Sequence, residues 1–77
     1  MSTKDIVVVS AARTPVGSFN GSLSSLTAAQ LGTVAIKAAL KRAKLEPGQI
    51  DEVILGQVLT AAQGQNPARI ASINAGI

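Results

Sequence analysis

The chemistry of this chain rests on carboxylates, hydroxyls, amides and guanidiniums, because its 77 residues include neither cysteine nor histidine. Without a thiol or an imidazole, these residues cannot assemble a serine triad or the commonest zinc-ligand sets. Asp51 and Glu52 are the only adjacent carboxylates. If they open a strand, their side chains point to opposite faces and cannot share a substrate as an acid/base pair. We therefore predict no catalytic residue and no metal site in this chain.

Three polar residues remain as candidates for binding. Arg13 follows a predicted buried strand, at the end where open parallel sheets place their ligands, although a guanidinium also brackets loop carbonyls or a neighbouring chain. Asn66 is expected to cap a helix, while Gln65 beside it could turn its amide toward a ligand or a partner subunit. The glycines form neither G-x-G-x-x-G nor a phosphate loop followed by Gly-Lys-Ser/Thr, which argues against nucleotide binding through those motifs.

The net charge is +3, and more than half of the basic residues lie on one predicted helix: Lys37, Lys41, Arg42 and Lys44. A solvated helix surface is the ordinary interpretation, because basic residues near a helix C-terminus complement its dipole. Nucleic-acid binding lacks support, since no aromatic side chains interleave with these charges. A third possible role of this basic surface is to bind the anionic tail of a small molecule.

The amino-terminal apolar run is too short for a signal peptide or a membrane span. The absence of cysteine also gives no sign of a disulfide framework. We therefore expect no membrane partner and a cytoplasmic location.

The hydrophobic pattern predicts alternating strands and helices. Ile6–Val9 is a run of β-branched residues without alternation, as in a strand buried on both faces. Val53–Leu55 is a second apolar run and buried-strand candidate, which could continue to Leu59 with Gly56 as a point of close approach. Between them, the small and polar residues of 10–25 predict a long loop, and residues 27–44 predict an amphipathic helix. A short helix is expected over 67–75.

Local signals define where these helices begin and end. Thr27 and Gln30 fit a capping box, and Pro47-Gly48 supplies the breakers that follow the first helix. Asn66-Pro67 places a capping residue before a proline at the first helical position, and Gly76 is expected to stop the second helix.

The resulting order, β-α-β-α, predicts an α/β fold with a right-handed parallel crossover. Both strands would retain unpaired edges and the helices uncovered faces. We therefore expect residues 1–77 to be the start of a larger α/β protein.

Two motifs carry a resemblance to a known family. They are VSAARTPVGSF at residues 9–19, and GQVL at 56–59 continuing to GQNPAR at 64–69. Together they resemble the amino-terminal region of thiolases, and QLG at 30–32 and DEVILG at 51–56 match in order and spacing. The stretch GSFNGSL at 17–23 is most similar to the short-chain, biosynthetic acetyl-CoA acetyltransferases. The resemblance covers nearly the whole chain.

The resemblance implies a fold and a reaction. The fold would be a five-layer α-β-α-β-α core of two similar halves, with residues 1–77 as the start of the first half and a homodimer or homotetramer as the assembly. The reaction would be a Claisen condensation of two acetyl-CoA to acetoacetyl-CoA and coenzyme A through an acyl-cysteine. The two cysteines and the histidine would lie outside these residues. Acyl-CoA thioesters would be substrates, without a resident cofactor.

The resemblance also suggests which residues border the catalytic cleft or a subunit interface. These are Arg13, Phe19, Gln65, Asn66 and Arg69, none of which is expected to make or break bonds. Two alternatives remain open at this point: a degradative 3-ketoacyl-CoA thiolase, and a truncated, non-catalytic interaction module.

Overall fold

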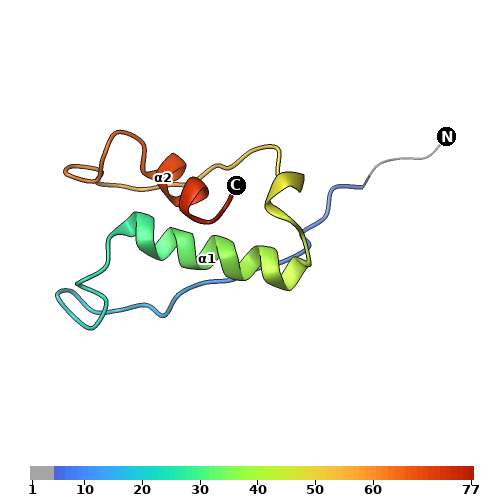
Figure 1. Cartoon of the computed structure of the whole chain (residues 1–77). Helices are drawn as coiled ribbons and strands as arrows, with labels where there is room; N and C mark the ends of the chain where they lie inside the picture. The colour runs from blue at the N-terminus through green and yellow to red at the C-terminus, as the bar shows by residue number, and fades with distance from the viewer. Residues whose placement is uncertain (1–4) are drawn as a thin grey trace.

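The computed structural model describes residues 5–77, which contain two α-helices and one short 3₁₀ helix (Figure 1). Helix α1 spans Ala28–Ala43, η1 spans Pro47–Gln49 and α2 spans Pro67–Asn74. The Cα radius of gyration is 14.4 Å, whereas a compact domain of this length would have about 11 Å. The chain is therefore elongated, with two helices packed together and long extended connections.

Helix α1 begins and ends through local hydrogen bonds that the sequence predicts. The backbone N–H of Thr27 donates to Gln30 Oε1 at 2.8 Å, and the N–H of Gln30 donates to Thr27 Oγ1 at 3.1 Å. At the other end Lys44 adopts left-handed φ and ψ of 58° and 40°. The Leu45 N–H then donates to the Leu40 carbonyl at 3.1 Å, which closes a Schellman motif. The predicted capping box and helix end are confirmed.

Helix α2 is terminated in the same way. Gly76 has a φ of +99°, a conformation that glycine adopts without steric cost. The Ile77 N–H donates to the Ser72 carbonyl at 2.9 Å and the Gly76 N–H donates to the Ile73 carbonyl at 3.0 Å. The predicted stop at Gly76 is confirmed.

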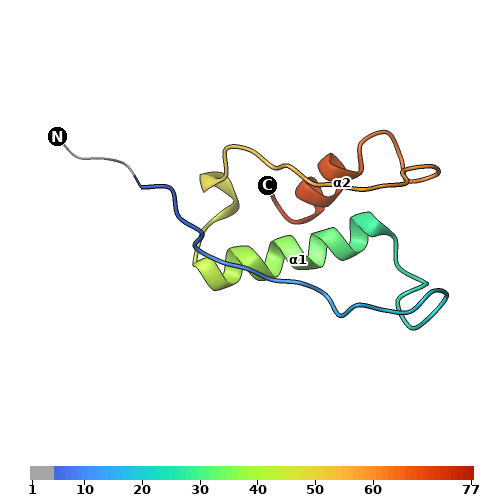
Figure 2. The same ribbon diagram turned by 180° about the vertical axis from the view of Figure 1, so that it is seen from behind.

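The two helices pack through small side chains, with α2 lying over the first half of α1 (Figures 1 and 2). The buried residues are Ala29 on α1, and Ala71, Ser72 and Ala75 at α2. A Cβ added to Gly32 would lie 3.4 Å from the Ala71 Cβ, so the backbones approach closely at this point. Burying so few methyl groups gives a small hydrophobic stabilisation.

A hydroxyl group adds one polar contact between the helices. Thr33 Oγ1 lies 2.8 Å from the Ala29 carbonyl oxygen of its own helix and 3.4 Å from the Ala71 carbonyl oxygen of α2. The short bond to Ala29 satisfies the hydroxyl within α1, and the longer contact points it toward α2.

The predicted strands, and with them the α/β layered fold, are wrong for the described residues. No β-strand is present among residues 5–77. Ile6–Val9 and Val53–Leu55 are free of helix and turn, but no backbone hydrogen bond joins them. Ile6 and Val8 are 101% and 90% exposed. The β-branched side chains favour an extended backbone, whereas a strand also requires a neighbouring strand to pair its N–H and C=O groups.

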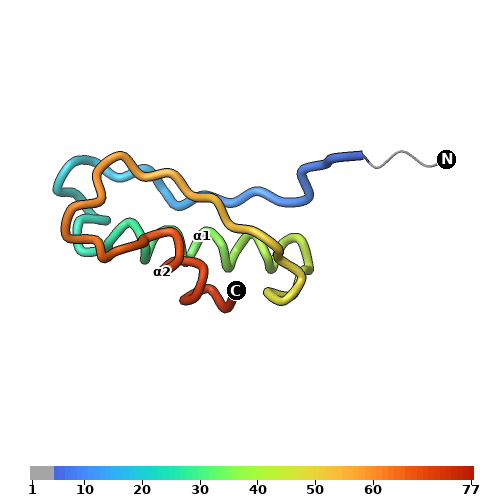
Figure 3. Tube along the Cα trace, turned by 90° about the horizontal axis from the view of Figure 1, so that it is seen from above, coloured from blue at the N-terminus to red at the C-terminus, as the bar shows by residue number. Residues whose placement is uncertain are grey.

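The two segments lie in one layer without touching. Figure 3 shows both on the same side of the helix pair, and in Figure 1 the first lies beyond the C-terminal end of α1 while the second runs above α1. They run in the same direction along α1 (Figure 3). In place of the predicted parallel crossover between two strands, the structure has two extended segments that run in the same direction without pairing.

The capping box predicts the effect of a single substitution. Thr27→Ala removes the side-chain acceptor of the Gln30 N–H and should lower the free energy of unfolding by about 1 kcal/mol. Urea denaturation followed by far-ultraviolet circular dichroism measures the change. Thr27→Ser keeps an acceptor and is the matched control; equal losses in both variants would contradict the assigned role.

The helix contact at Gly32 predicts opposite effects of two substitutions. Gly32→Ala should be tolerated and should raise helix stability by up to about 1 kcal/mol, because its methyl group reaches ordinary contact distance from Ala71. Gly32→Leu should separate the helices and lower the free energy of unfolding by about 1–3 kcal/mol. Thermal unfolding of the two variants distinguishes them, and equal stabilities would show that the helices do not pack here.

Candidate functional site

Three of the five residues predicted to border a cleft or an interface gather at the N-terminus of α2. Gln65, Asn66 and Arg69 line one cleft of about 410 Å³ together with Ile70, Ile73 and Asn74. Gln65 and Asn66 precede the helix and Arg69 is its third residue, so the helix start itself places them together. We define these three residues as the α2 polar cluster.

Asn66 acts as the N-cap of α2. Its side-chain oxygen accepts a hydrogen bond from the Arg69 N–H at 3.1 Å, and its backbone carbonyl accepts from the Ile70 N–H at 3.0 Å. Pro67 occupies the first helical position, where the missing N–H costs no helical hydrogen bond. The predicted cap is confirmed, and the NH₂ group of the Asn66 side chain makes no hydrogen bond within residues 5–77.

Arg69 lies between two clefts. In addition to the 410 Å³ cleft that it shares with Gln65 and Asn66, Arg69 lines a second cleft of about 380 Å³ together with Asp51 and Glu52. Arg69 is exposed, and beside it Ile73 is 51% exposed. A guanidinium and amides around exposed isoleucines suit recognition of another polar surface; they supply no nucleophile and no general base.

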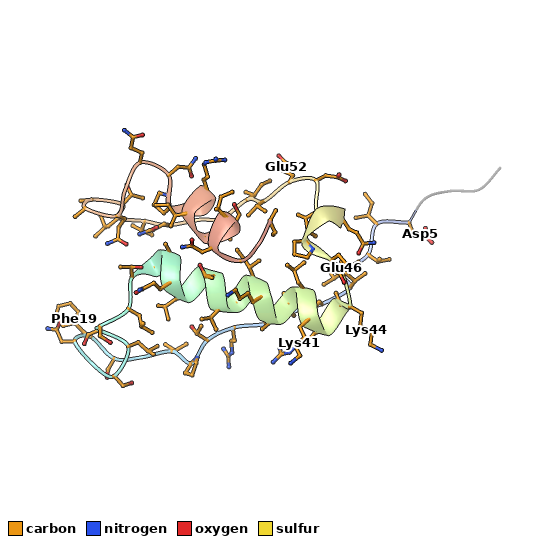
Figure 4. All side chains as sticks on the ribbon, in the orientation of Figure 1. Asp5, Phe19, Lys41, Lys44, Glu46 and Glu52 are labelled. Carbon is orange, nitrogen blue, oxygen red and sulfur yellow. The ribbon has the colours of Figure 1, made fainter. Side chains whose placement is uncertain are left out.

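Arg13 and Phe19 lie apart from the α2 polar cluster and line none of the clefts described here. Arg13 is exposed on the segment that precedes α1. Phe19 is 95% exposed and lies in the loop before α1 (Figure 4). Its loop is tightened by a hydrogen bond of 2.8 Å from the Gly21 N–H to the Ser18 carbonyl, with Asn20 at a φ of 55°. The structure therefore places these two residues on a separate part of the chain.

One long-range hydrogen bond ties the segment that carries Arg13 to α1. Arg42 Nη1 donates to the Ala11 carbonyl at 2.9 Å. The sequence suggests that Arg13 binds loop carbonyls, but in the structure Arg42 makes such a bond. The Arg13 side chain makes no hydrogen bond within residues 5–77.

Sequence reasoning missed a third cleft, of about 260 Å³, where the N-termini of α1 and α2 meet. Its polar lining includes Gln57, Thr60 and Asn66, and Gln57 Nε2 donates to the Leu59 carbonyl at 2.9 Å. Gly56 also lines the cleft, but a Cβ added to it would meet no atom within 4 Å, so a close approach of the backbone does not explain this glycine. This cleft contains no ionisable side chain.

The described residues hold no cluster of three or more potential metal ligands. None of the helices described for residues 5–77 combines the length and the apolar character needed to cross a lipid bilayer. Asp51 and Glu52 are exposed where the sequence predicts a strand entry. The three clefts are lined by amide, hydroxyl, guanidinium and carboxylate groups beside apolar side chains.

Comparison with known proteins decides the family. Residues 6–77 match the family described as the N-terminal domain of thiolase. This chain belongs to the thiolase family. The match covers more than nine-tenths of the 77 residues, and so includes both the motif around Arg13 and the α2 polar cluster.

Individual thiolase relatives are similar over almost the whole chain. Acetyl-CoA acetyltransferase of Cupriavidus necator is 63% identical over 73 residues, which is 95% of this chain and 19% of the relative. Acetyl-CoA acetyltransferase 1 of Arabidopsis thaliana is 60% identical over 96% of this chain and 18% of the relative. The cytosolic acetyl-CoA acetyltransferase of Mus musculus is 57% identical over 94% of this chain and 18% of the relative. This thiolase chain spans about a fifth of the length of these relatives.

The capping geometry of Asn66 leads to a test of its role in this thiolase chain. Asn66→Ala should lower the free energy of unfolding by about 1 kcal/mol, because the Arg69 N–H loses its acceptor. Asn66→Asp keeps an acceptor and should stay within a few tenths of a kcal/mol of the parent chain. Urea denaturation measures both, and an unchanged stability of Asn66→Ala would remove the capping role.

Proposed function

We propose that this chain is the amino-terminal part of an acetyl-CoA acetyltransferase, which interconverts two acetyl-CoA with acetoacetyl-CoA and free coenzyme A. The observation that carries the proposal is identity of 57–63% to proteins of that name over 92–100% of the chain. These names favour the short-chain activity over the degradative 3-ketoacyl-CoA thiolase. They also favour an enzyme over a non-catalytic interaction module.

In this proposal the chain supplies scaffold and recognition surface. The chain contains no cysteine and no histidine, so an acyl-cysteine intermediate and its activating imidazole would come from further polypeptide. Residues 1–77 would form the start of the N-terminal half-domain and would be inactive alone. Acyl-CoA thioesters are the substrates, and no metal or redox cofactor is required.

A homodimer or homotetramer is the proposed assembly, with the α2 polar cluster near a subunit interface. The supporting observation is chemical: Ile73 and Ile70 are exposed and lie among the polar side chains of Gln65, Asn66 and Arg69. An apolar centre with a polar rim is the usual composition of a protein interface. Arg13 and Phe19 would contribute to a different part of the cleft or interface.

A cytoplasmic location is proposed as well. Its support is the word cytosolic in the names of the relatives from Mus musculus and Rattus norvegicus, which are both 57% identical to this chain.

A chimaera tests the proposed activity. In Cupriavidus necator acetyl-CoA acetyltransferase, the 73 matching residues are replaced by the corresponding residues of this chain. Thiolysis of acetoacetyl-CoA by coenzyme A is then measured, with the parent enzyme alongside. We expect kcat/KM within about tenfold of the parent, a change of no more than about 1.4 kcal/mol in transition-state stabilisation. The isolated 77-residue chain should show no thiolysis.

In the matched control, the same residues are replaced by those of the Mus musculus relative. This control shows whether the parent enzyme tolerates any related segment at this place. A chimaera that folds and assembles like the parent, yet lacks thiolysis while the control is active, would contradict the proposal.

A further inference from the structure

All charged residues between positions 6 and 45 are basic: Arg13, Lys37, Lys41, Arg42 and Lys44. The four acidic residues lie outside this range, and α1 itself carries none. Exposed helices usually intersperse both signs, because like charges four residues apart repel each other and unlike charges attract. Helix α1 therefore has a positive charge that its own residues do not compensate.

Three of these residues form one exposed surface. Lys41 follows Lys37 by four residues within α1, so their side chains emerge on one side of the helix, and Lys44 follows as the left-handed C-cap residue just beyond it. All three are exposed, and Figure 4 shows Lys41 and Lys44 at the C-terminal end of α1, on the side away from α2. Arg42 is engaged with the Ala11 carbonyl at 2.9 Å. We define Lys37, Lys41 and Lys44 as the α1 lysine face.

The helix dipole accounts for only part of this face. Its effect falls off within the last turn, which contains Lys41 and Arg42. Lys37 lies more than one turn before the C-terminus of α1, and Lys44 has the carboxylate of Glu46 two residues away. Lys37 and Lys41 are thus left as neighbouring positive charges on the same side of the helix.

From this arrangement we propose, resting on the proposed function, that the α1 lysine face binds the polyphosphate end of acyl-CoA thioesters and is acylated by them. Lys37 and Lys41 lie about 6 Å apart along the helix axis and Lys44 follows just beyond its end, so a ligand with more than one phosphate group contacts two of them at once. Nucleic acid is the weaker fit, because the only aromatic residue, Phe19, lies in the loop before α1 and offers no base stacking at this face.

The group transfer needs no further reactant. The neutral Nζ of a lysine attacks the thioester carbonyl carbon, a C–N bond forms and the C–S bond breaks. The electron pair leaves on sulfur, and the proton lost by nitrogen is taken up to give free coenzyme A thiol. Each transfer replaces an ammonium by a neutral amide, so successive acylations weaken the attraction for the next anionic ligand.

The test compares two acetyl donors on the full 77-residue chain. Acetyl-CoA carries phosphates, whereas S-acetyl-N-acetylcysteamine is an uncharged acetyl thioester. The chain is incubated with each at mildly alkaline pH and low salt, and acetylation is quantified at every lysine by peptide mass spectrometry. Lys4, a lysine outside α1, is the internal reference.

We expect the acetylation rate at the α1 lysine face, relative to that at Lys4, to be at least about threefold higher with acetyl-CoA than with the uncharged donor. The difference should vanish near 1 M salt, where charges are screened over about 3 Å. Equal ratios for the two donors, or a ratio that salt does not change, would overturn the inference.

Paired variants test whether the flanking charges are responsible. In Lys37→Gln/Lys44→Gln the preference of Lys41 for acetyl-CoA should be lost, while Lys37→Arg/Lys44→Arg should retain it, because arginine keeps the charge and is not acylated. Loss in both variants would overturn the inference.

The outcome is separable from that of the chimaera, since acetylation of the chain requires no turnover. An active chimaera without donor preference rejects this inference alone. A donor preference with an inactive chimaera supports the lysine face and contradicts the acetyltransferase proposal.

Discussion

The close approach of α1 and α2 at Gly32 and Ala71 is the contact on which the packed part of this chain depends. Ala71 is 1% exposed, and no large side chain is fully buried in the described residues. Small residues let two backbones come near each other, but they remove little apolar surface from water. The helix pair is consequently defined more by complementary backbone surfaces and by end caps than by a hydrophobic core.

The same constraint explains the exposed segments. The alanine-lined contact between the two helices covers neither Ile6–Val9 nor the other extended segment, which includes the largely exposed Ile54. Their apolar side chains therefore remain in water, where each one forgoes about 1.5–3 kcal/mol of burial. The Arg42 hydrogen bond to Ala11 fixes the position of the first segment without covering it.

The two surfaces proposed for recognition both arise from local helix geometry. The α2 polar cluster owes its arrangement to the cap of the helix, since Asn66 binds the Arg69 backbone and thereby places Gln65 and Arg69 on either side of the helix start. In the α1 lysine face, helical periodicity places Lys37 and Lys41, whereas Lys44 is placed by the left-handed cap of the helix. Both are proposed as surfaces for polar or anionic partners, and neither contains a thiol or an imidazole.

The amino-acid sequence by itself determined the helices and their ends, because capping boxes, proline at the first turn and a left-handed stop act between residues at most a few positions apart. It also determined the family, through motifs spread over residues 6–77. The tertiary structure alone decided that Ile6–Val9 and Val53–Leu55 stay unpaired, that Gly32 faces Ala71, and that Arg13 and Phe19 lie apart from Asn66. Strand pairing and helix contact join residues that are distant in the chain. The hydrophobic pattern therefore indicates whether a segment prefers a helix or a strand, but it does not determine which other segment it packs against.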